Sequence, residues 1–140
     1  PAHPRFRGDF CGSGAFAEGW VHASPWTGAR HLAPDEHLAE TERLAQRRLD
    51  VLPDCTIDTF EAWPTEDGCA WRCRVAGHTG DGVAHEAWEQ HFATTDAGGR
   101  ITRLEVFRDW LGFPQLMGAV IRLSIDDLWD PAVYLRWLDT

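Results

Sequence analysis

The pattern of apolar and polar positions divides the chain into an early helix, a central group of strands and a helical end. Between Pro34 and Leu52, leucine and alanine return every three or four positions, which predicts an amphipathic helix. Pro34 suits a first helical position, and Pro53-Asp54 ends the pattern. Acidic residues come early in this segment and arginines late, an order that complements the helix dipole.

After residue 54 the apolar positions alternate, which is typical of half-buried strands. We predict four strands, at Cys55–Trp63, Cys69–Thr79, His85–Thr94 and Ile101–Trp110. The three breaks between them are rich in residues that form tight turns. Because these breaks are short, the strands are expected to form an antiparallel meander.

The two ends of the chain show different patterns. Residues 1–30 look irregular, and only a short strand around Gly19 to Ala23 is expected there. The pattern turns helical from about Pro114 to Leu123. A last helix is predicted from Asp130-Pro131, where a capping residue precedes a first-turn proline. One helix, a curved meander and closing helices predict an α+β fold, and 140 residues suit one domain over 1–140.

Composition narrows the classes of partner. Asp and Glu number 22 against 13 Lys and Arg, a formal charge of −9. This argues against nucleic acid and against an anionic membrane surface, because both attract clustered cations. No apolar run approaches the length of a membrane span, and no signal peptide is visible, so a cytoplasmic location is expected. Eight tryptophans suit a core, an interface or an aromatic-lined cavity.

Motifs for cofactor or metal chemistry find little support. The chain has no glycine-rich phosphate loop and no Gly-x-Ser-x-Gly elbow. Its cysteines, which are Cys11, Cys55, Cys69 and Cys73, include no Cys-x-x-Cys pair. No group of His, Cys and carboxylate residues has the spacing of metal ligands along the sequence. We therefore expect free, buried thiols, no cofactor and no metal.

One carboxylate, Asp109, stands where the last predicted strand passes into a helix. A carboxyl group shielded from water at such a junction can take up and return a proton beside a carbonyl group. The same residue could instead cap the following turn or pair with an arginine such as Arg108. The residues alone leave both interpretations open.

Four segments in order carry a resemblance to a known family. They are Val51-Leu-Pro-Asp54, Ala76-Gly-His-Thr-Gly80, the strand opening at Gly99-Arg-Ile-Thr, and Arg108-Asp-Trp-Leu-Gly-Phe113. Together they resemble the SnoaL-like polyketide cyclases, within the nuclear transport factor 2-like and ketosteroid isomerase-like superfamily. The similarity covers residues 32–118. Residues 1–30 lack the family's two opening helices, and the helix within 124–140 is extra.

The resemblance implies a strongly curved, mostly antiparallel sheet that forms a cone packed on helices. It also implies one deep hydrophobic pocket and a homodimer formed through the outer sheet face. Asp109 matches the position of the family's acid/base aspartate. The family often places a pocket-facing histidine on the preceding strand, which makes His91 the expected partner of Asp109.

Sheet register decides whether Asp109 meets His91. A three-residue loop at 97–99 would put both on one face, whereas a two- or four-residue loop would put Asp109 with Trp88 and Gln90. The polar pattern does not choose between the two registers. The prediction takes His91, with Gln90 as the alternative donor.

The favoured function is a cofactor-free cyclase, isomerase or dehydratase that acts on a hydrophobic, oxygenated small molecule such as a polyketide or terpenoid intermediate. The alternative is a non-catalytic module of the same fold that binds a small molecule or a protein. An epoxide hydrolase using Arg103, Glu105 and Asp109 is less favoured. The predicted pocket walls, most of them aromatic, are Phe107, Trp63, Trp71, Trp88, Gln90 and Phe113.

Overall fold

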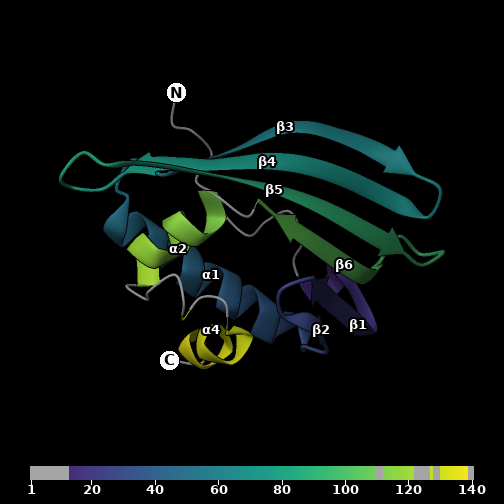
Figure 1. Cartoon of the computed structure of the whole chain (residues 1–140). Helices are drawn as coiled ribbons and strands as arrows, with labels where there is room; N and C mark the ends of the chain where they lie inside the picture. The colour runs from purple at the N-terminus through teal and green to yellow at the C-terminus, as the bar shows by residue number, and fades with distance from the viewer. Residues whose placement is uncertain (1–12, 110–111, 122–126, 128–129, 139–140) are drawn as a thin grey trace.

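A six-stranded sheet lies over a layer of helices in the computed structural model, which describes residues 13–109, 112–121, 127 and 130–138 (Figure 1). The strand order is β2-β1-β6-β5-β4-β3. The strands are β1 (Phe16–Ser24), β2 (Gly28–Arg30), β3 (Thr56–Thr65), β4 (Gly68–His78), β5 (Ala84–Thr95) and β6 (Ile101–Arg108). The helices are α1 (Pro34–Val51), α2 (Gly112–Ile121) and α4 (Pro131–Leu138), with a 3-10 turn at Ser13–Ala15.

The predicted α+β fold and the meander of β3 to β6 are confirmed, since each of these strands pairs antiparallel with the next. The helix α1 begins at the predicted proline and ends one residue before the predicted end. Its acidic first turn and basic last turn are the ones expected from the sequence. The cap of α4 is also as predicted, because Asp130 Oδ1 accepts the backbone N–H of Ala132 at 2.9 Å.

The first thirty residues hold more regular structure than the sequence indicated. The strand β1 has nine residues and pairs antiparallel with β2 and parallel with β6, so the sheet is mixed. The pairing of β1 with β6 slips between Phe16 and Val21, where Gly19 has a φ of 69°. This irregularity interrupts the alternation of apolar and polar positions by which a strand is recognised in a sequence. Residues 1–12, including Cys11, lie outside the described residues. Cys55, Cys69 and Cys73 are free thiols as expected, but only Cys73 is buried and Cys69 is exposed.

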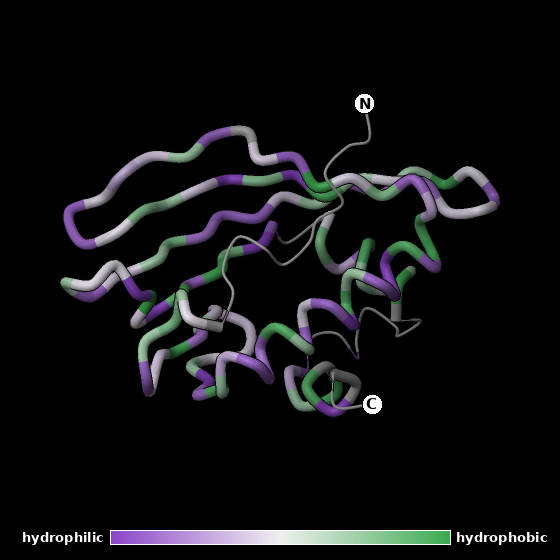
Figure 2. Tube along the Cα trace, turned by 180° about the vertical axis from the view of Figure 1, so that it is seen from behind, coloured by the Kyte–Doolittle hydropathy of each residue, from purple (hydrophilic) through white to green (hydrophobic). Residues whose placement is uncertain are grey.

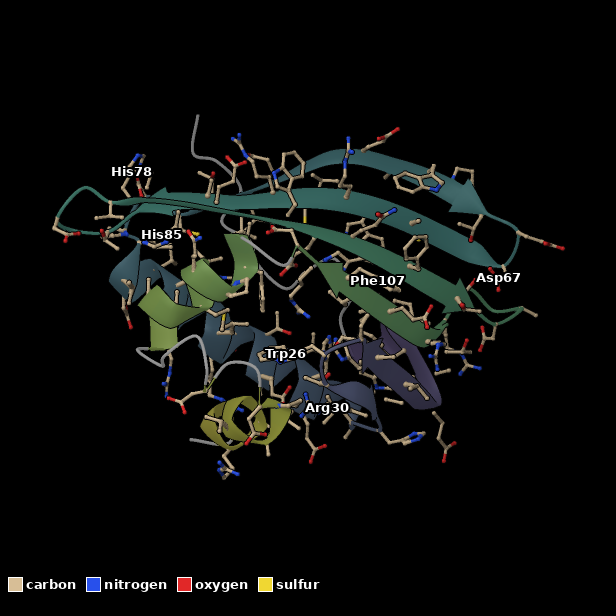
Figure 3. The ribbon with its side chains drawn as sticks, in the orientation of Figure 1. Trp26, Arg30, Asp67, His78, His85 and Phe107 are labelled. Carbon is tan, nitrogen blue, oxygen red and sulfur yellow. The ribbon has the colours of Figure 1, made fainter. Side chains whose placement is uncertain are left out.

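Two of the four segments behind the family resemblance meet in space. The carboxylate of Asp54, just after α1, accepts the backbone N–H of His78 at 2.6 Å. The His78 ring lies 2.8 Å away from the other Asp54 oxygen through Nδ1. These contacts join the end of α1 to the end of β4, at the left of Figure 3. These two sequence segments therefore form an exposed structural contact between α1 and β4.

The predicted β5–β6 register is wrong, although the predicted loop is correct. Asp96 donates its N–H to Arg100 O at 2.9 Å, across the three-residue loop. A bulge then intervenes, because Thr95 pairs with Ile101 while Thr94 pairs with Arg103. One extra residue in β6 turns every later side chain to the opposite face.

The bulge separates the two residues that the sequence analysis placed together. His91 is opposite Val106, on the side of the sheet that faces the helices. Asp109 is opposite Trp88, and its backbone N–H donates to Trp88 O at 3.0 Å. The observed register therefore does not pair Asp109 with a residue on the face of β5 that carries His91.

The core fills the space between the concave face of the sheet and the helices. One cluster joins α2 to β4, β5 and the end of α1, and includes Leu52, Val75, Ala87, Leu116 and Met117. A second cluster lies under β1 and β6 and includes Phe16, Trp20, Ile101, Leu104 and Val106. Figure 2 shows the matching alternation of hydrophobic and hydrophilic positions along the strands. None of the described helices is long and apolar enough to cross a membrane.

Candidate functional site

A small pocket of about 70 Å³ opens between α1, the β1–β2 hairpin and the end of β6. Helix α1 contributes side chains at helical spacing along one face, whereas β1, β2 and β6 each contribute one polar side chain. The lining residues are His22, Thr27, Arg30, His37, Glu40, Thr41, Leu44 and Arg108. Figure 3 shows Arg30 and Trp26 beneath the sheet, beside α1. The pocket is therefore lined mostly by polar and charged residues, whereas the surrounding core is apolar.

Two histidines face each other in this pocket. The ring centroids of His22 and His37 are 5.4 Å apart, and the Trp20 ring lies 4.8 Å from that of His37. Burial, followed by the nearby His37 and Arg108, lowers the pKa of His22 to about 3. Burial also lowers the pKa of His37, although the Glu40 carboxylate partly opposes this shift. Both imidazoles are therefore predominantly neutral at pH 7.

Some polar atoms beside the pocket lack partners. Within the described residues, the buried Nδ1 of His22 and the buried Nε1 of Trp20 make no hydrogen bond. The indole N–H of Trp20 can only donate, whereas the Nδ1 of a neutral histidine can donate or accept. Buried polar groups in folded proteins are normally paired, so these atoms are candidates for contacts with water or a ligand.

Two arginines of the pocket lining form ion pairs. Arg30 donates both terminal nitrogens to Glu40, at 3.1 and 2.7 Å. Arg108 donates Nε to Glu89 Oε1 at 3.1 Å, and its guanidinium carbon lies 4.8 Å from the centre of the Phe113 ring. The terminal nitrogens of Arg108 make no hydrogen bond with the described residues. The ring and the carboxylate thus hold a guanidinium that still has unused donors.

Behind Arg108, a second polar cluster joins β4 to β5. His91 Nε2 lies 3.1 Å from Glu89 Oε2 and 3.8 Å from Cys73 Sγ. The ring of Trp71 stacks on His91 with centroids 4.9 Å apart. Burial alone would raise the pKa of Glu89, but the Arg108 charge and the hydrogen bond from His91 together lower it well below its usual range.

One donor atom from each of Cys73, Glu89 and His91 lies within 4.8 Å of the others, a set that could hold a metal ion. The sequence analysis missed this set because its members come from two strands; the pairing of Cys73 with Glu89 brings them together. Two features oppose a bound cation. The guanidinium of Arg108 occupies the other oxygen of Glu89, and burial, with the Glu89 charge, raises the pKa of the Cys73 thiol to about 12.

Asp109 connects the end of β6 to the start of α2. Its Oδ2 accepts the backbone N–H of Trp88 at 2.6 Å. Its Oδ1 accepts the backbone N–H groups of Gly112 and Phe113, the latter at 3.4 Å. A side chain on Gly112 would overlap the carbonyl oxygen of Glu86, so only glycine allows this approach. This is the capping arrangement that the sequence analysis gave as one of its two interpretations of Asp109.

The predicted pocket walls divide between the two faces of the sheet. Trp71 stacks on His91, and Phe113 contacts Trp26 and Arg108 in the core. The other four are in register with outer-face positions, because the β6 bulge and strand alternation place them there. These residues are Trp63, Trp88, Gln90 and Phe107, and none of them lines the pocket described above.

The residues proposed for epoxide opening also lie apart from the pocket. Arg103 donates to Glu105 at 2.8 Å, in an exposed pair on the outer face. The polar residues that do line the pocket were missed, although α1 gave a signal. His37, Thr41, Leu44 and Arg48 recur at helical spacing along the buried face of this helix. Polar residues on an otherwise apolar helix face are the pattern that could have found the site.

No protein-family model matches the chain, and no curated protein matches its sequence. Solved structures do resemble it. A nuclear transport factor 2-like protein from Burkholderia thailandensis E264 is 24% identical, with a TM-score of 0.54 over 74% of this chain and 80% of that one. A protein of ketosteroid isomerase-like fold from Catenulispora acidiphila DSM 44928, in complex with trimethylamine, is 13% identical, with a TM-score of 0.54 over 81% and 82%.

A protein from Jannaschia sp. CCS1, assigned to the SnoaL-like polyketide cyclases, is 12% identical, with a TM-score of 0.53 over 79% of this chain and 76% of that one. At these identities the likeness establishes the fold alone. The chain therefore has the nuclear transport factor 2-like, ketosteroid isomerase-like fold that the sequence motifs indicated.

Proposed function

We propose that this protein is a cofactor-free acid/base enzyme that acts on an oxygenated small molecule, held with its reacting end in the pocket under β1 and β6. The observation that carries the proposal is the pair of neutral imidazoles, His22 and His37, 5.4 Å apart beside the unused donors of Arg108. A neutral imidazole can accept a proton, and a guanidinium can stabilise the negative charge that then develops on oxygen.

The pocket suggests a role for each group. His37 accepts a proton from a carbon beside a carbonyl group, and the electron pair of the broken C–H bond moves onto the carbonyl oxygen as an enolate. His22 and Arg108 stabilise that oxygen. Glu40, whose charge raises the pKa of His37, stabilises the protonated ring. Return of the proton to a different carbon or to the oxygen gives an isomer. In a cyclisation, the enolate carbon bonds to a second carbonyl carbon, whose oxygen takes the proton. In a dehydration, a hydroxyl group on the neighbouring carbon takes the proton and leaves as water.

Asp109 is the alternative proton carrier that the sequence predicted, with His91 as its partner. In this alternative, a proton on the carboxylate would have to displace hydrogen bonds from the backbone of Trp88 or Gly112. His91 would act through Glu89, to which it is bonded, and not through Asp109. We favour His37 because it lines the pocket, and matched substitutions separate the two assignments.

The test is proton exchange at carbon in a small ketone. Cyclohexanone is incubated with the protein in D₂O, and deuterium entry beside the carbonyl is followed by NMR. We expect the protein to accelerate exchange and His37→Gln to remove the acceleration. His31→Gln, at an exposed position, is the matched control and should behave as the unchanged protein. Exchange at an unchanged rate in His37→Gln would reject the assigned role.

A non-catalytic binding module of the same fold is the second candidate, and the size of the pocket favours it. Its volume of about 70 Å³ is well below the roughly 300–1,000 Å³ of pockets that enclose a whole drug-sized ligand. Only one end of such a ligand would enter. Binding of a ligand without exchange or turnover, lost in variants of the pocket residues, would support this candidate over the enzyme.

We also propose that two copies pair through the outer sheet face. Phe107 is 43% exposed, and its ring meets that of Phe92 edge to face at 5.7 Å. Trp63 and Trp88 share this face, with the Arg72 guanidinium 5.5 Å from the Trp88 ring centre. Aromatic residues and arginine are enriched at protein interfaces, and a group of half-buried rings around the exposed Phe107 favours burial against a partner.

A further inference from the structure

The region around the pocket carries more positive than negative charge, although the whole chain is acidic, with a formal charge of −9. Three arginines lie there, Arg30, Arg48 and Arg108, against two carboxylates, those of Glu40 and Glu89. The neighbouring histidines His22 and His37 add no charge near neutral pH, since burial lowers the pKa of each. Among these described groups, Glu40 pairs with Arg30 and Glu89 pairs with Arg108, which leaves one arginine without an ion pair of its own.

Arg48 is that arginine. It is 8% exposed, and its side chain makes no hydrogen bond or ion pair with any residue of the described ranges. It lies one helical turn beyond Leu44, which lines the pocket, on the buried face of α1. Its positive charge acts to lower the pKa of both Glu89 and Cys73, in the cluster behind Arg108. Glu89 is hydrogen-bonded to Arg108, so a further anion close to both guanidinium groups would lower the free energy of both.

Arg108 provides the contact that a ligand could use. Glu89 holds its Nε, and the Phe113 ring packs against the guanidinium, so the orientation of the group is fixed. Its terminal nitrogens remain unbonded to the described residues at the pocket wall. A guanidinium presents its N–H groups as a planar fork that matches the two oxygens of a carboxylate.

We propose that the ligand of this protein is an anion, a carboxylate or an equally acidic enol, whose oxygens bind the terminal nitrogens of Arg108 within the field of Arg48. The inference rests on the proposed function for the location of the ligand, and it narrows the substrate class from oxygenated molecules in general to those with an anionic head group. A pocket of about 70 Å³ suits such a head group, with the apolar remainder of the molecule outside.

The same charges disfavour the main rival for this region, a metal at Cys73, Glu89 and His91. A cation bound there would face the guanidinium of Arg108, bonded to Glu89, and the charge of Arg48. Like charges at short range raise the free energy of the bound state, whereas an anion lowers it. The excess charge therefore selects an anionic ligand over a metal ion.

The test compares levulinate with methyl levulinate, which have the same ketone and carbon chain but differ in charge. Binding of each to the full chain is followed by NMR titration of backbone amides. We expect levulinate to bind at least tenfold more tightly than the ester, with shifts at His22, His37 and Arg108. Arg108→Lys keeps the charge but loses the fork, and should weaken levulinate binding severalfold. Arg48→Met should also weaken it.

Arg103→Gln, on the outer face, is the control and should leave levulinate binding unchanged. Removal of the Arg108 charge by Arg108→Gln alone would leave Glu89 unpaired. The double variant Glu89→Gln/Arg108→Gln removes both charges together, so it serves as a second variant with balanced charge. Equal binding of acid and ester overturns the anion inference but leaves the proposed pocket in place. If neither levulinate nor methyl levulinate shifts the amide signals of the pocket residues in a folded protein, both the anion inference and the proposed location of the ligand are overturned.

Discussion

Asp109 and Trp88 exchange two hydrogen bonds where β6 ends beside β5. The backbone N–H of Asp109 donates to Trp88 O at 3.0 Å, and the backbone N–H of Trp88 donates to Asp109 Oδ2 at 2.6 Å. The other oxygen of Asp109 accepts N–H groups from the first turn of α2. One carboxylate thus ends the strand, begins the helix and fixes the helix against the sheet.

Asp109→Ala should therefore destabilise the fold. Capping interactions and hydrogen bonds to a charged group are each worth roughly 1–3 kcal/mol, so a loss of about 2–4 kcal/mol is expected in urea unfolding. Asp109→Asn keeps an acceptor oxygen and should lose less. Under our assignment, the rate of deuterium exchange per folded molecule in Asp109→Asn stays within twofold of the unchanged protein. A folded Asn variant without exchange would restore Asp109 as the proton carrier.

The low pKa of His22 predicts a loss of stability in mild acid. Between its ordinary value of 6.5 and about 3, the unfolded chain binds a proton at this residue and the folded chain does not. Acid therefore favours unfolding in this window, by up to about 1.4 kcal/mol per pH unit. Stability from this group is fully present above pH 6.5 and declines as the pH falls.

The measurement is urea unfolding of the unchanged protein and His22→Gln between pH 7 and 5, where carboxylates of ordinary pKa titrate little. We expect the free energy of unfolding to depend less steeply on pH in His22→Gln than in the unchanged protein. His31→Gln, at an exposed site, should keep the original slope. His37 acts in the same direction, because burial lowers its pKa too. In the double variant His22→Gln/His37→Gln, the free energy of unfolding should therefore depend even less on pH. An unchanged slope in the double variant would contradict the predicted origin of the acid sensitivity.

The ion pair of Glu89 and Arg108 should behave as a buried pair. Their side chains are only 13% and 19% exposed. Glu89→Gln leaves the guanidinium uncompensated and should cost about 3–5 kcal/mol in urea unfolding. The balanced variant Glu89→Gln/Arg108→Gln should cost clearly less than the sum of the two single changes. Additive costs would show that the two charges do not interact, and would remove the anchoring that we assign to Glu89.

The sequence predicted α1 and the four meander strands because their periodicities are strong and their ends carry proline or turn residues. It placed a short strand at Gly19 to Ala23 but missed the first residues of β1, which lie before the irregularity near Gly19, and it missed β2. It also placed Asp109 and His91 together, since a correct three-residue loop gave no sign of the bulge that follows. Register depends on backbone pairing across two strands, which no local pattern along one strand records.

The candidate site shows the same limit. Trp63, Trp88 and Phe107 were expected in a pocket because aromatic rings suit one, yet strand alternation places them on the outer face. The polar lining comes from four elements, and only its α1 members follow a pattern within one element. Arg108 was considered as a partner of Asp109, whereas its partner is Glu89, which is directly opposite Arg108 on the neighbouring strand β5.

The outer-face rings provide the last prediction. Phe107→Glu places a charge in the centre of the proposed interface, where burial of an unpaired carboxylate is costly. We expect the unchanged protein to sediment as a dimer and Phe107→Glu as a folded monomer in analytical ultracentrifugation. Val83→Glu, an equally exposed apolar position outside the cluster, is the control and should remain dimeric. If the unchanged protein is monomeric at micromolar concentration, or if Phe107→Glu still pairs, the interface does not involve this face.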